Sequence, residues 1–300
     1  MYGRRAVSFP APPRPAFPAE QAHTARAFLR YEDVAQDGRL MPIALPATTD
    51  GLWYEVLRAH PAQRAAIAQG IIPILRRLTL TALEAPIRVD EPIESSAGFL
   101  LAHDLDAAGE PRIFLNVWTE LHGAAGRIGA RPSGPPVLAG HLFAEHVFTR
   151  PFAPPDRRRV TRLPVDGDQA VPELRYDAPA PETAAEAPAG ARWLDDLAPD
   201  PAEIAFTLDQ TDSNQHVNSL VYLRVFLDAA ARRFAAGGHP LKVLTREIDI
   251  AYRKPCFAGD RVRVHLRLFE AGGALGAAGF IAAPGEEARP RCYVRAIARP

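Results

Sequence analysis

The chain has 300 residues, enough for one large domain or for two ordinary domains that each bury a core. Lysine plus arginine and aspartate plus glutamate both number 35, so the net charge is zero and neither nucleic acid nor an anionic membrane surface is indicated as a partner. The two cysteines, Cys256 and Cys292, lack the Cys-x-x-Cys spacing, which argues against a disulfide framework and against a zinc site.

The N-terminal 22 residues contain several prolines and arginines but no apolar run. No signal peptide is therefore predicted, and no stretch of the chain approaches the ~20 apolar residues of a membrane span. We expect a cytoplasmic protein with a loose, proline-rich tail over residues 1–22.

Residues 23–150 have the pattern of an N-terminal domain that mixes helix and strand. A strand is expected over 27–34, followed by a helix that begins near 48–50 and is interrupted at Pro61. Further strands are predicted from apolar and alternating segments over 75–83, 93–104, 112–121 and 140–150.

Residues 151–192 are rich in proline and alanine and have no periodicity. Prolines at this density interrupt ladders and helices, so we expect a linker that is draped over the protein or lacks order. Its arginines are either a solvated run or a contact surface for an acidic protein partner. These residues are Arg157, Arg158, Arg159 and Arg162.

Residues 193–300 are expected to form a C-terminal domain. A strand over 203–208 is followed by a helix over 220–236, which Gly237 and Gly238 end. The helix has one apolar stripe, made of Leu220, Leu223, Leu227, Ala230, Ala231 and Phe234. Four more strands are predicted over 241–252, 261–269, 274–282 and 291–298.

The two halves of the chain correspond to each other. Segment 75–87 aligns with segment 244–256 at one constant offset, and each half reads as a helix followed by about four antiparallel strands. Two copies placed side by side would cover their exposed edges and form a continuous sheet. The pattern therefore predicts a duplicated α+β fold.

A polar loop, Asp209 to Asn218, separates the strand over 203–208 from the long helix. It contains carboxylates, carboxamides and an imidazole. The N–H groups at a helix start attract developing negative charge, so the loop has the components for acid–base catalysis and oxyanion stabilisation. The alternative is a loop that caps the helix and carries a solvated histidine.

The loop sequence from Asp212 to Asn218 reads Asp-Ser-Asn-Gln-His-Val-Asn, and the segment from Tyr252 to Cys256 reads Tyr-Arg-Lys-Pro-Cys. Both resemble the C-terminal half of the plant and bacterial acyl-ACP thioesterases. The resemblance covers about residues 203–268 and implies a double hotdog, in which each half is a long helix wrapped by an antiparallel sheet. It also implies hydrolysis of a thioester carried by acyl carrier protein or coenzyme A.

The resemblance implies catalytic roles for three residues. Asp212 would be the base or nucleophile, Asn214 would hold the carbonyl, the water or the carboxylate, and His216 would polarise the substrate or transfer a proton. The backbone N–H groups near Val217 and Asn218 are the expected oxyanion donors.

At two positions near the end of the matching strand, the roles known in the family cannot simply be assigned to this chain. The family has a catalytic glutamate directly before its cysteine, and this chain has Pro255 there. We therefore expect Asp212 and His216 to share the activation of water. Cys256 matches the family cysteine, but it is expected to be inert packing because it has no neighbouring base except Lys254.

Only the C-terminal half has this loop, so the N-terminal domain is expected to be without a catalytic loop. No nucleotide-binding, serine-hydrolase or zinc-protease motif is present, and no cofactor is implied. A hydratase or dehydratase acting on acyl thioesters, and a non-catalytic acyl-thioester binder, are the alternatives. The chain is expected to be a monomer or a homodimer.

Overall fold

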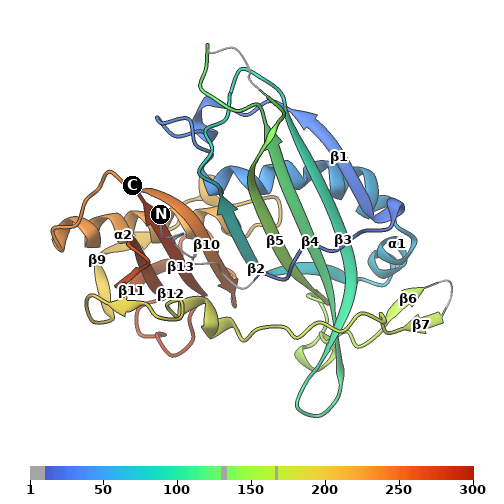
Figure 1. Ribbon diagram of the computed structural model, residues 1–300. Coiled ribbons are helices and arrows are strands. Elements are labelled where there is room, and N and C mark those ends of the chain that lie inside the picture. Colours follow the sequence, from blue (N-terminus) through green and yellow to red (C-terminus); the bar gives the residue numbers. More distant parts are fainter. Residues whose placement is uncertain (1–10, 130–133, 166–167) are drawn as a thin grey trace. The chain divides into compact units, whose positions relative to one another are not determined.

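A computed structural model describes residues 11–129, 134–165 and 168–300 (Figure 1). The chain divides into two compact units. The N-terminal unit comprises 11–78 and 82–179, and the C-terminal unit comprises 180–300 with the short segment 79–81. The division after residue 179 falls earlier than the expected domain start at 193, because the last part of the expected linker packs with the C-terminal strands.

The N-terminal unit is built on an antiparallel sheet. Its strands are β1 (Ala22–Ala27), β2 (Ile72–Ala82), β3 (Ile93–Leu105), β4 (Pro111–Gly123) and β5 (Val137–Thr149). They follow the order β1-β3-β4-β5-β2. The four strands predicted after residue 70 are confirmed to within three residues at each end.

The first predicted strand, over 27–34, is wrong. The strand β1 ends at Ala27, and a short 3₁₀ turn occupies Tyr31–Asp33. The turn forms because the Asp33 carboxylate accepts a hydrogen bond from the Arg30 N–H at 2.9 Å. A carboxylate that accepts a hydrogen bond from a backbone N–H three residues earlier in this way competes with strand formation.

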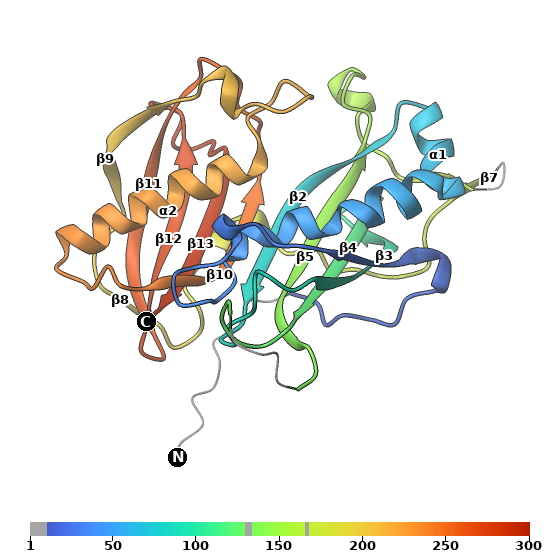
Figure 2. The same ribbon diagram turned by 90° about the horizontal axis from the view of Figure 1, so that it is seen from above.

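The helical part of the N-terminal unit is irregular. It consists of a 3₁₀ segment Pro42–Thr49, a π-helical segment Leu52–Val56, a 3₁₀ turn Leu57–Ala59 and helix α1 (Pro61–Ala68). Proline lacks the N–H that a regular helix needs. Pro42 begins the run, Pro46 lies inside the 3₁₀ segment, and Pro61 begins α1. The run still lies along the sheet (Figure 2). Its fully buried residues include Leu45, Leu52, Leu57 and Ala66.

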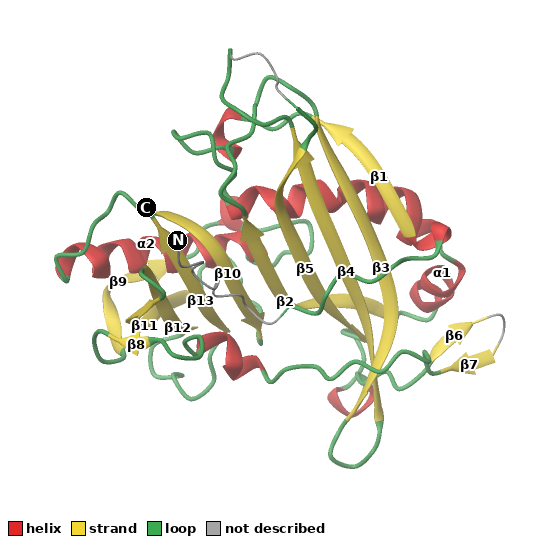
Figure 3. Ribbon diagram, viewed as in Figure 1, coloured by secondary structure: helices red, strands yellow, loops and turns green. Residues whose placement is uncertain are grey.

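The C-terminal unit contains the one long helix in the described part of the chain, α2 (Ser219–Ala236). Its strands are β8 (Arg192–Trp193), β9 (Ala198–Ala205), β10 (Leu244–Tyr252), β11 (Arg261–Ala271), β12 (Ala274–Ala282) and β13 (Cys292–Arg299). The order is β10-β13-β12-β11, and both β8 and β9 pair with β11. Helix α2 contacts β9, β11, β12 and β13 (Figure 3). The α+β class and the helix-on-sheet architecture predicted for this half are confirmed.

Strand β11 has one fully buried face, as its alternating sequence predicts. Val262, Val264, Leu266 and Leu268 are buried on that face. On the same strand Phe269 pairs with Gly276 of β12, and a Cβ on that glycine would lie 2.1 Å from the phenyl ring. Glycine is therefore required at 276 because the aromatic ring fills the space of its missing side chain.

The internal correspondence is visible in both units. Strands β2 and β10 are aligned by the constant offset, and each follows the helical part of its own unit. The aligned arginines Arg77 and Arg246 are both almost completely buried. Buried arginine is uncommon, so its occurrence at two aligned positions favours duplication. Continuity of the two sheets remains a prediction.

Much of the segment 151–192 is ordered, contrary to expectation. It includes a 3₁₀ turn Pro155–Arg157, the hairpin of β6 (Leu163–Val165) and β7 (Asp168–Ala170), and a 3₁₀ turn Pro181–Ala185. Side-chain hydrogen bonds and ion pairs, rather than a long strand pairing, hold this segment to the N-terminal unit. The Tyr176 hydroxyl donates to the buried Glu145 carboxylate at 2.6 Å, and Glu145 also pairs with Arg76.

The N-terminal tail is also held to the protein from residue 11 onwards. The Trp118 indole N–H donates to the Pro12 carbonyl at 3.0 Å, and the Phe17 ring lies 5.8 Å from the Trp118 ring. Phe17 covers Gly98, where a Cβ would be 2.4 Å from the ring. The expectation of a loose tail is wrong for 11–22, and residues 1–10 lie outside the described part. No helix in the described ranges is long and apolar enough to cross a membrane.

Candidate active site

The polar loop between β9 and α2 folds into a tight hairpin. Thr211 forms an antiparallel bridge with Val217, and the Asp212 N–H donates to the His216 carbonyl at 2.8 Å. The turn is closed by Gln215, which has a φ of 66° and donates its N–H to the Asp212 carbonyl. Residues directly opposite in an antiparallel pair project to the same face, so Asp212 and His216 lie on one face of the hairpin, with no hydrogen bond or ion pair between their side chains.

The side chains of the hairpin differ in exposure. Asp212 and His216 are half-buried, whereas Ser213, Asn214 and Gln215 at the tip are exposed. One oxygen of the Asp212 carboxylate accepts the Asn214 N–H at 2.8 Å. Asn214 therefore orients the carboxylate through its backbone, and the second carboxylate oxygen points away from this bond.

The imidazole of His216 packs against an aromatic ring that the sequence analysis did not single out. The Phe257 ring lies 5.2 Å from it, edge-on at 73°. Phe257 follows Cys256 directly and is 47% exposed. Its position next to the matching cysteine is the signal that could have identified it.

Asn218 is the N-cap of α2. Its side-chain oxygen accepts the Leu220 N–H at 2.9 Å, and its carbonyl accepts the Val221 N–H. The N–H groups expected to bind an oxyanion are both occupied: Val217 donates to the Cys256 carbonyl at 2.8 Å, and Asn218 donates to Gln210 at 2.9 Å. Neither is free for an oxyanion in this structure. Among the described residues of the first helical turn, Ser219 has an N–H without an acceptor.

Cys256 links the loop to the helix through its backbone. Its carbonyl accepts from Val217, and its N–H donates to the Tyr222 hydroxyl at 2.8 Å. The side chain is fully buried, and burial raises the pKa of the thiol, which keeps it in the weakly reactive protonated form. Tyr222 was not identified from the sequence, because a tyrosine in a helical stripe has the pattern of an ordinary core residue.

A second tyrosine reinforces the same junction. The Tyr252 hydroxyl donates to the Ser219 carbonyl at 3.0 Å, and the Tyr252 and Tyr222 rings meet edge-on at 5.9 Å. Burial raises the pKa of both hydroxyls, so both remain protonated. The start of α2 and the end of β10 are thus fixed to each other on the side of the loop.

Two other carboxylates of this region, Asp260 after Pro255 and Asp209 at the start of the polar loop, do not take the place of the family glutamate. Asp260 accepts the Phe257 N–H at 3.0 Å, which closes the turn after Cys256. Asp209 is exposed in the short 3₁₀ turn Leu208–Gln210, outside the hairpin. Asp212 is therefore the carboxylate that stands opposite His216 in the backbone pairing of the hairpin.

Comparison with protein families gives one match for this part of the chain. Residues 204–287 match the acyl-ACP thioesterase C-terminal domain. The match contains the hairpin, the helix and Cys256. It confirms the resemblance and the class of thioester hydrolase that the sequence indicated. No curated protein matches the chain.

Solved structures of thioesterases have the same fold over almost the whole chain. The 12:0-ACP thioesterase from Umbellularia californica is 12% identical with a TM-score of 0.60, covering 93% of this chain and 94% of its own. A putative oleoyl thioesterase from Lactobacillus plantarum is 14% identical with a TM-score of 0.59, covering 94% and 96%. An acyl-ACP thioesterase from Bacteroides thetaiotaomicron is 14% identical with a TM-score of 0.58, covering 93% and 98%. The double hotdog fold is confirmed.

Proposed function

We propose that this chain, whose residues 204–287 carry the acyl-ACP thioesterase C-terminal domain, releases a fatty or related acyl chain from acyl carrier protein. The observation that supports this proposal most directly is the hairpin pairing of Asp212 with His216 at the start of α2. A carboxylate and an imidazole held on one face can move a proton between water and substrate.

Hydrolysis begins with the activation of a water molecule. The free oxygen of the Asp212 carboxylate accepts one proton of the water, and His216 takes up or relays that proton. The water oxygen forms a bond to the thioester carbon, and the carbonyl electrons move to its oxygen. With proline at 255, these two side chains supply the acid–base chemistry without a second carboxylate at that position.

The tetrahedral intermediate needs a hydrogen-bond donor for its negative oxygen. The Ser219 N–H is the first-turn donor that the fold leaves unoccupied, and it lies at the positive end of the α2 dipole. When the intermediate collapses, the carbon–sulfur bond breaks and its electrons leave with the sulfur. A thiolate leaves readily near neutral pH because thiols have a pKa of about 8.5.

The decisive experiment measures the release of free acid from acyl carrier protein and from coenzyme A thioesters. Asp212→Asn and His216→Gln should each lower kcat by about 10²- to 10⁴-fold, since each removes a proton-transfer group. Asp209→Asn is the matched control, because it neutralises an exposed carboxylate of the same loop outside the hairpin. It should retain the wild-type rate.

The readout also separates the proposal from its alternatives. Mass spectrometry of the acyl carrier distinguishes loss of the acyl chain from gain or loss of one water within that chain, the mark of a hydratase or dehydratase. Binding of an acyl thioester with no turnover would indicate a binder. Wild-type rates in both hairpin variants would overturn the catalytic assignment of Asp212 and His216.

A further inference from the structure

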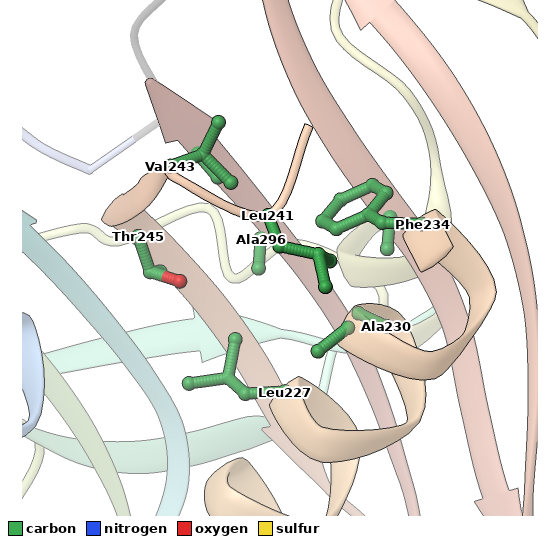
Figure 4. Close-up of a pocket in the computed structure, with 10 residues that line it drawn as sticks. Leu227, Ala230, Phe234, Leu241, Val243, Thr245 and Ala296 are labelled. Carbon is green, nitrogen blue, oxygen red and sulfur yellow. The ribbon is translucent and has the colours of Figure 1, made fainter. Parts of the chain in front are cut away.

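Two apolar surfaces of the protein differ in their chemistry. The cavity of about 90 Å³ beside α2 is lined mainly by aliphatic side chains, such as Leu227, Leu241 and Val243 (Figure 4). The N-terminal sheet instead has an aromatic pair, Trp118 of β4 and Phe143 of β5, whose ring centroids are 5.1 Å apart. Aromatic surfaces of this kind are the ones on which proline-rich segments dock.

The aromatic pair lies on the face of the N-terminal sheet that is turned away from the helical run, here called the outer face. Trp53 of that run contacts His146, which is opposite Leu115 in the pairing of β5 with β4. Successive side chains of a strand point to alternate faces, so Trp118 and the opposite Phe143 belong to the other face.

Residues 11–18 of the N-terminal tail have the features of a polyproline II helix. Four of these eight residues are prolines, and Pro18 has a φ of −54° and a ψ of 146°, near the polyproline II values of about −75° and about 145°. Within the described ranges, no N–H or carbonyl group of residues 11–17 bonds to another backbone group. A polyproline II helix has no internal hydrogen bonds either, which leaves its carbonyls free to accept from other groups.

The burial of the tail follows the turn of such a helix. Pro12 and Pro15 are half-buried, whereas Pro13 and Arg14 between them are exposed. Because polyproline II has three residues per turn, residues three apart lie on the same edge. Pro12 and Pro15 therefore belong to the edge of the tail that rests on the sheet.

Side chains on the outer face hold the tail. The Trp118 indole N–H donates to the Pro12 carbonyl at 3.0 Å. One pair further along β3 and β4, Ser96 lies directly opposite Glu120. The Arg14 guanidinium donates to the Ser96 hydroxyl at 2.8 Å and lies 3.8 Å from the Glu120 carboxylate. The sheet thus supplies a donor for a backbone carbonyl and a carboxylate for an arginine.

Phe17 adds the apolar part of the contact. Its ring lies 5.8 Å from the Trp118 ring and fills the space above Gly98. The Arg14 guanidinium lies 5.1 Å from the centre of the Phe17 ring. The carbonyl contact and the charged contact fix the direction in which the segment lies, and the rings supply buried area. An aromatic-lined surface that receives a preformed polyproline II helix is a general mode of peptide recognition.

The tail is held as a separable ligand would be. Its contacts with the outer face run through side chains and one carbonyl, with no strand pairing. Segments near a chain end that lack backbone bonds detach at a small fraction of the free energy of global unfolding. A segment of the same chemistry from another chain fits the same contacts without any change in the sheet.

We propose that the outer face around Trp118 is a binding site for a polyproline II segment with an arginine two residues after its first proline. In this chain the tail fills the site, and a proline-rich segment of a partner protein displaces it. The inference goes beyond the hydrolysis reaction and does not depend on it. A tethered tail competes at an effective concentration in the millimolar range, so a free peptide binds weakly until the tail is released.

The test follows the Trp118 indole N–H by NMR in the full-length protein. The chain has three tryptophans, and Trp118→Phe identifies which of the three indole signals belongs to position 118. Arg14→Glu places a carboxylate beside Glu120 and should release the tail, which removes the carbonyl from the indole and moves its signal. The probe is a synthetic peptide with the sequence of residues 11–18, added to the wild type and to the Arg14→Glu chain.

Glu120→Gln and Glu94→Gln, each combined with Arg14→Glu, form a matched pair. Glu94 lies on the same face of the sheet as Ser96, is exposed, and pairs with Arg26 outside the tail. Glu120→Gln should weaken peptide binding about two- to fivefold at low salt, because it removes an exposed ion pair. Glu94→Gln should leave the peptide affinity unchanged.

The peptide should bind the Arg14→Glu chain at least about tenfold more tightly than the wild type, and it should return the Trp118 signal towards its wild-type position. No return of the signal at peptide concentrations up to about 1 mM would overturn the inference, as would equal losses from Glu120→Gln and Glu94→Gln. Phe17→Ser is the second tail variant, since it removes the ring above Gly98. A Trp118 signal that neither tail variant moves would also overturn the inference, because these contacts would then not hold the tail.

Discussion

The Val217 N–H donates to the Cys256 carbonyl at 2.8 Å, which joins the hairpin to the end of β10. The Cys256 N–H in turn donates to the Tyr222 hydroxyl at the same distance. The backbone of Cys256 thus holds both the loop that carries Asp212 and His216 and the first turns of α2. The proposed chemistry of the hairpin depends on this junction for its position, although none of the three linking residues moves a proton in the proposed reaction.

Tyr222→Phe should destabilise the C-terminal unit. The change leaves the buried Cys256 N–H without an acceptor, which costs about 1 to 3 kcal/mol of unfolding free energy. Urea unfolding followed by circular dichroism measures this difference. Tyr54→Phe is the control, because Tyr54 is 70% exposed and should shift stability by less than about 0.5 kcal/mol. Equal stability of the two variants would show that the bond to Cys256 is dispensable.

Cys256→Ala should retain most of the hydrolase activity. The thiol is fully buried with a raised pKa, and the contacts of Cys256 to the hairpin use its backbone, which alanine preserves. We expect kcat within about threefold of the wild type, together with a stability loss of about 1 kcal/mol from the missing sulfur atom. Free-acid release measured beside urea unfolding separates the two effects. A loss of activity comparable to that of Asp212→Asn would assign the thiol a chemical role.

The sequence was sufficient for α2 and the four strands that follow it because their patterns are local, whereas the strand expected over 203–208 lies earlier, at β9 (Ala198–Ala205). Strand β11 alternates buried and polar residues, and α2 has an apolar stripe that two glycines end, so both ranges could be predicted closely. The occupation of the Val217 and Asn218 N–H groups could not be predicted. Their acceptors belong to backbone segments that the fold brings together, and no periodicity in the sequence records such pairings.

In the N-terminal half, the sequence-based prediction failed for a different reason. Proline density correctly indicated breaks in the helix, but it also suggested that the tail and the linker lack order. Both are held instead by single long-range contacts, such as Trp118 with Pro12 and Tyr176 with Glu145. Each of these contacts needs a partner residue that only the folded sheet brings close to the segment. A proline-rich composition therefore predicts that a segment forms no helix or strand. It does not predict whether the segment has a fixed position on the protein.

Tyr176→Phe should loosen the segment that follows β7. The lost hydroxyl donates to the buried Glu145 carboxylate, and a hydrogen bond to a charged group contributes about 1.5 to 3 kcal/mol. Hydrogen exchange should rise at the Tyr176 and His103 amides, which hold the segment to β3. Tyr31→Phe, at a 75% exposed site of the same unit, is the control. Unchanged exchange at both amides would mean that the backbone bonds alone fix the segment.

The stability of the protein should fall in mild acid because of His146. This residue is buried in β5 with its ring edge-on to Trp53 at 5.0 Å, and burial lowers its pKa to about 4. Its unfolded pKa is about 6.5, so between pH 6.5 and 4 the unfolded chain binds a proton that the folded chain does not. The contribution of neutral His146 is complete above pH 6.5 and is lost as the pH falls through this window. Between pH 7 and 5 the loss should be about 2 kcal/mol.

His146→Phe tests this assignment because phenylalanine keeps an aromatic contact with Trp53 and does not titrate. The unfolding free energy of wild type and variant is measured in urea at pH 7 and pH 5. The carboxylates contribute equally to both proteins, so the difference between the two pH dependences isolates the imidazole. The variant should lose about 2 kcal/mol less than the wild type on acidification. Parallel losses would mean that the folded protein accommodates the imidazolium, and that the buried face of β5 opens to water when His146 is charged.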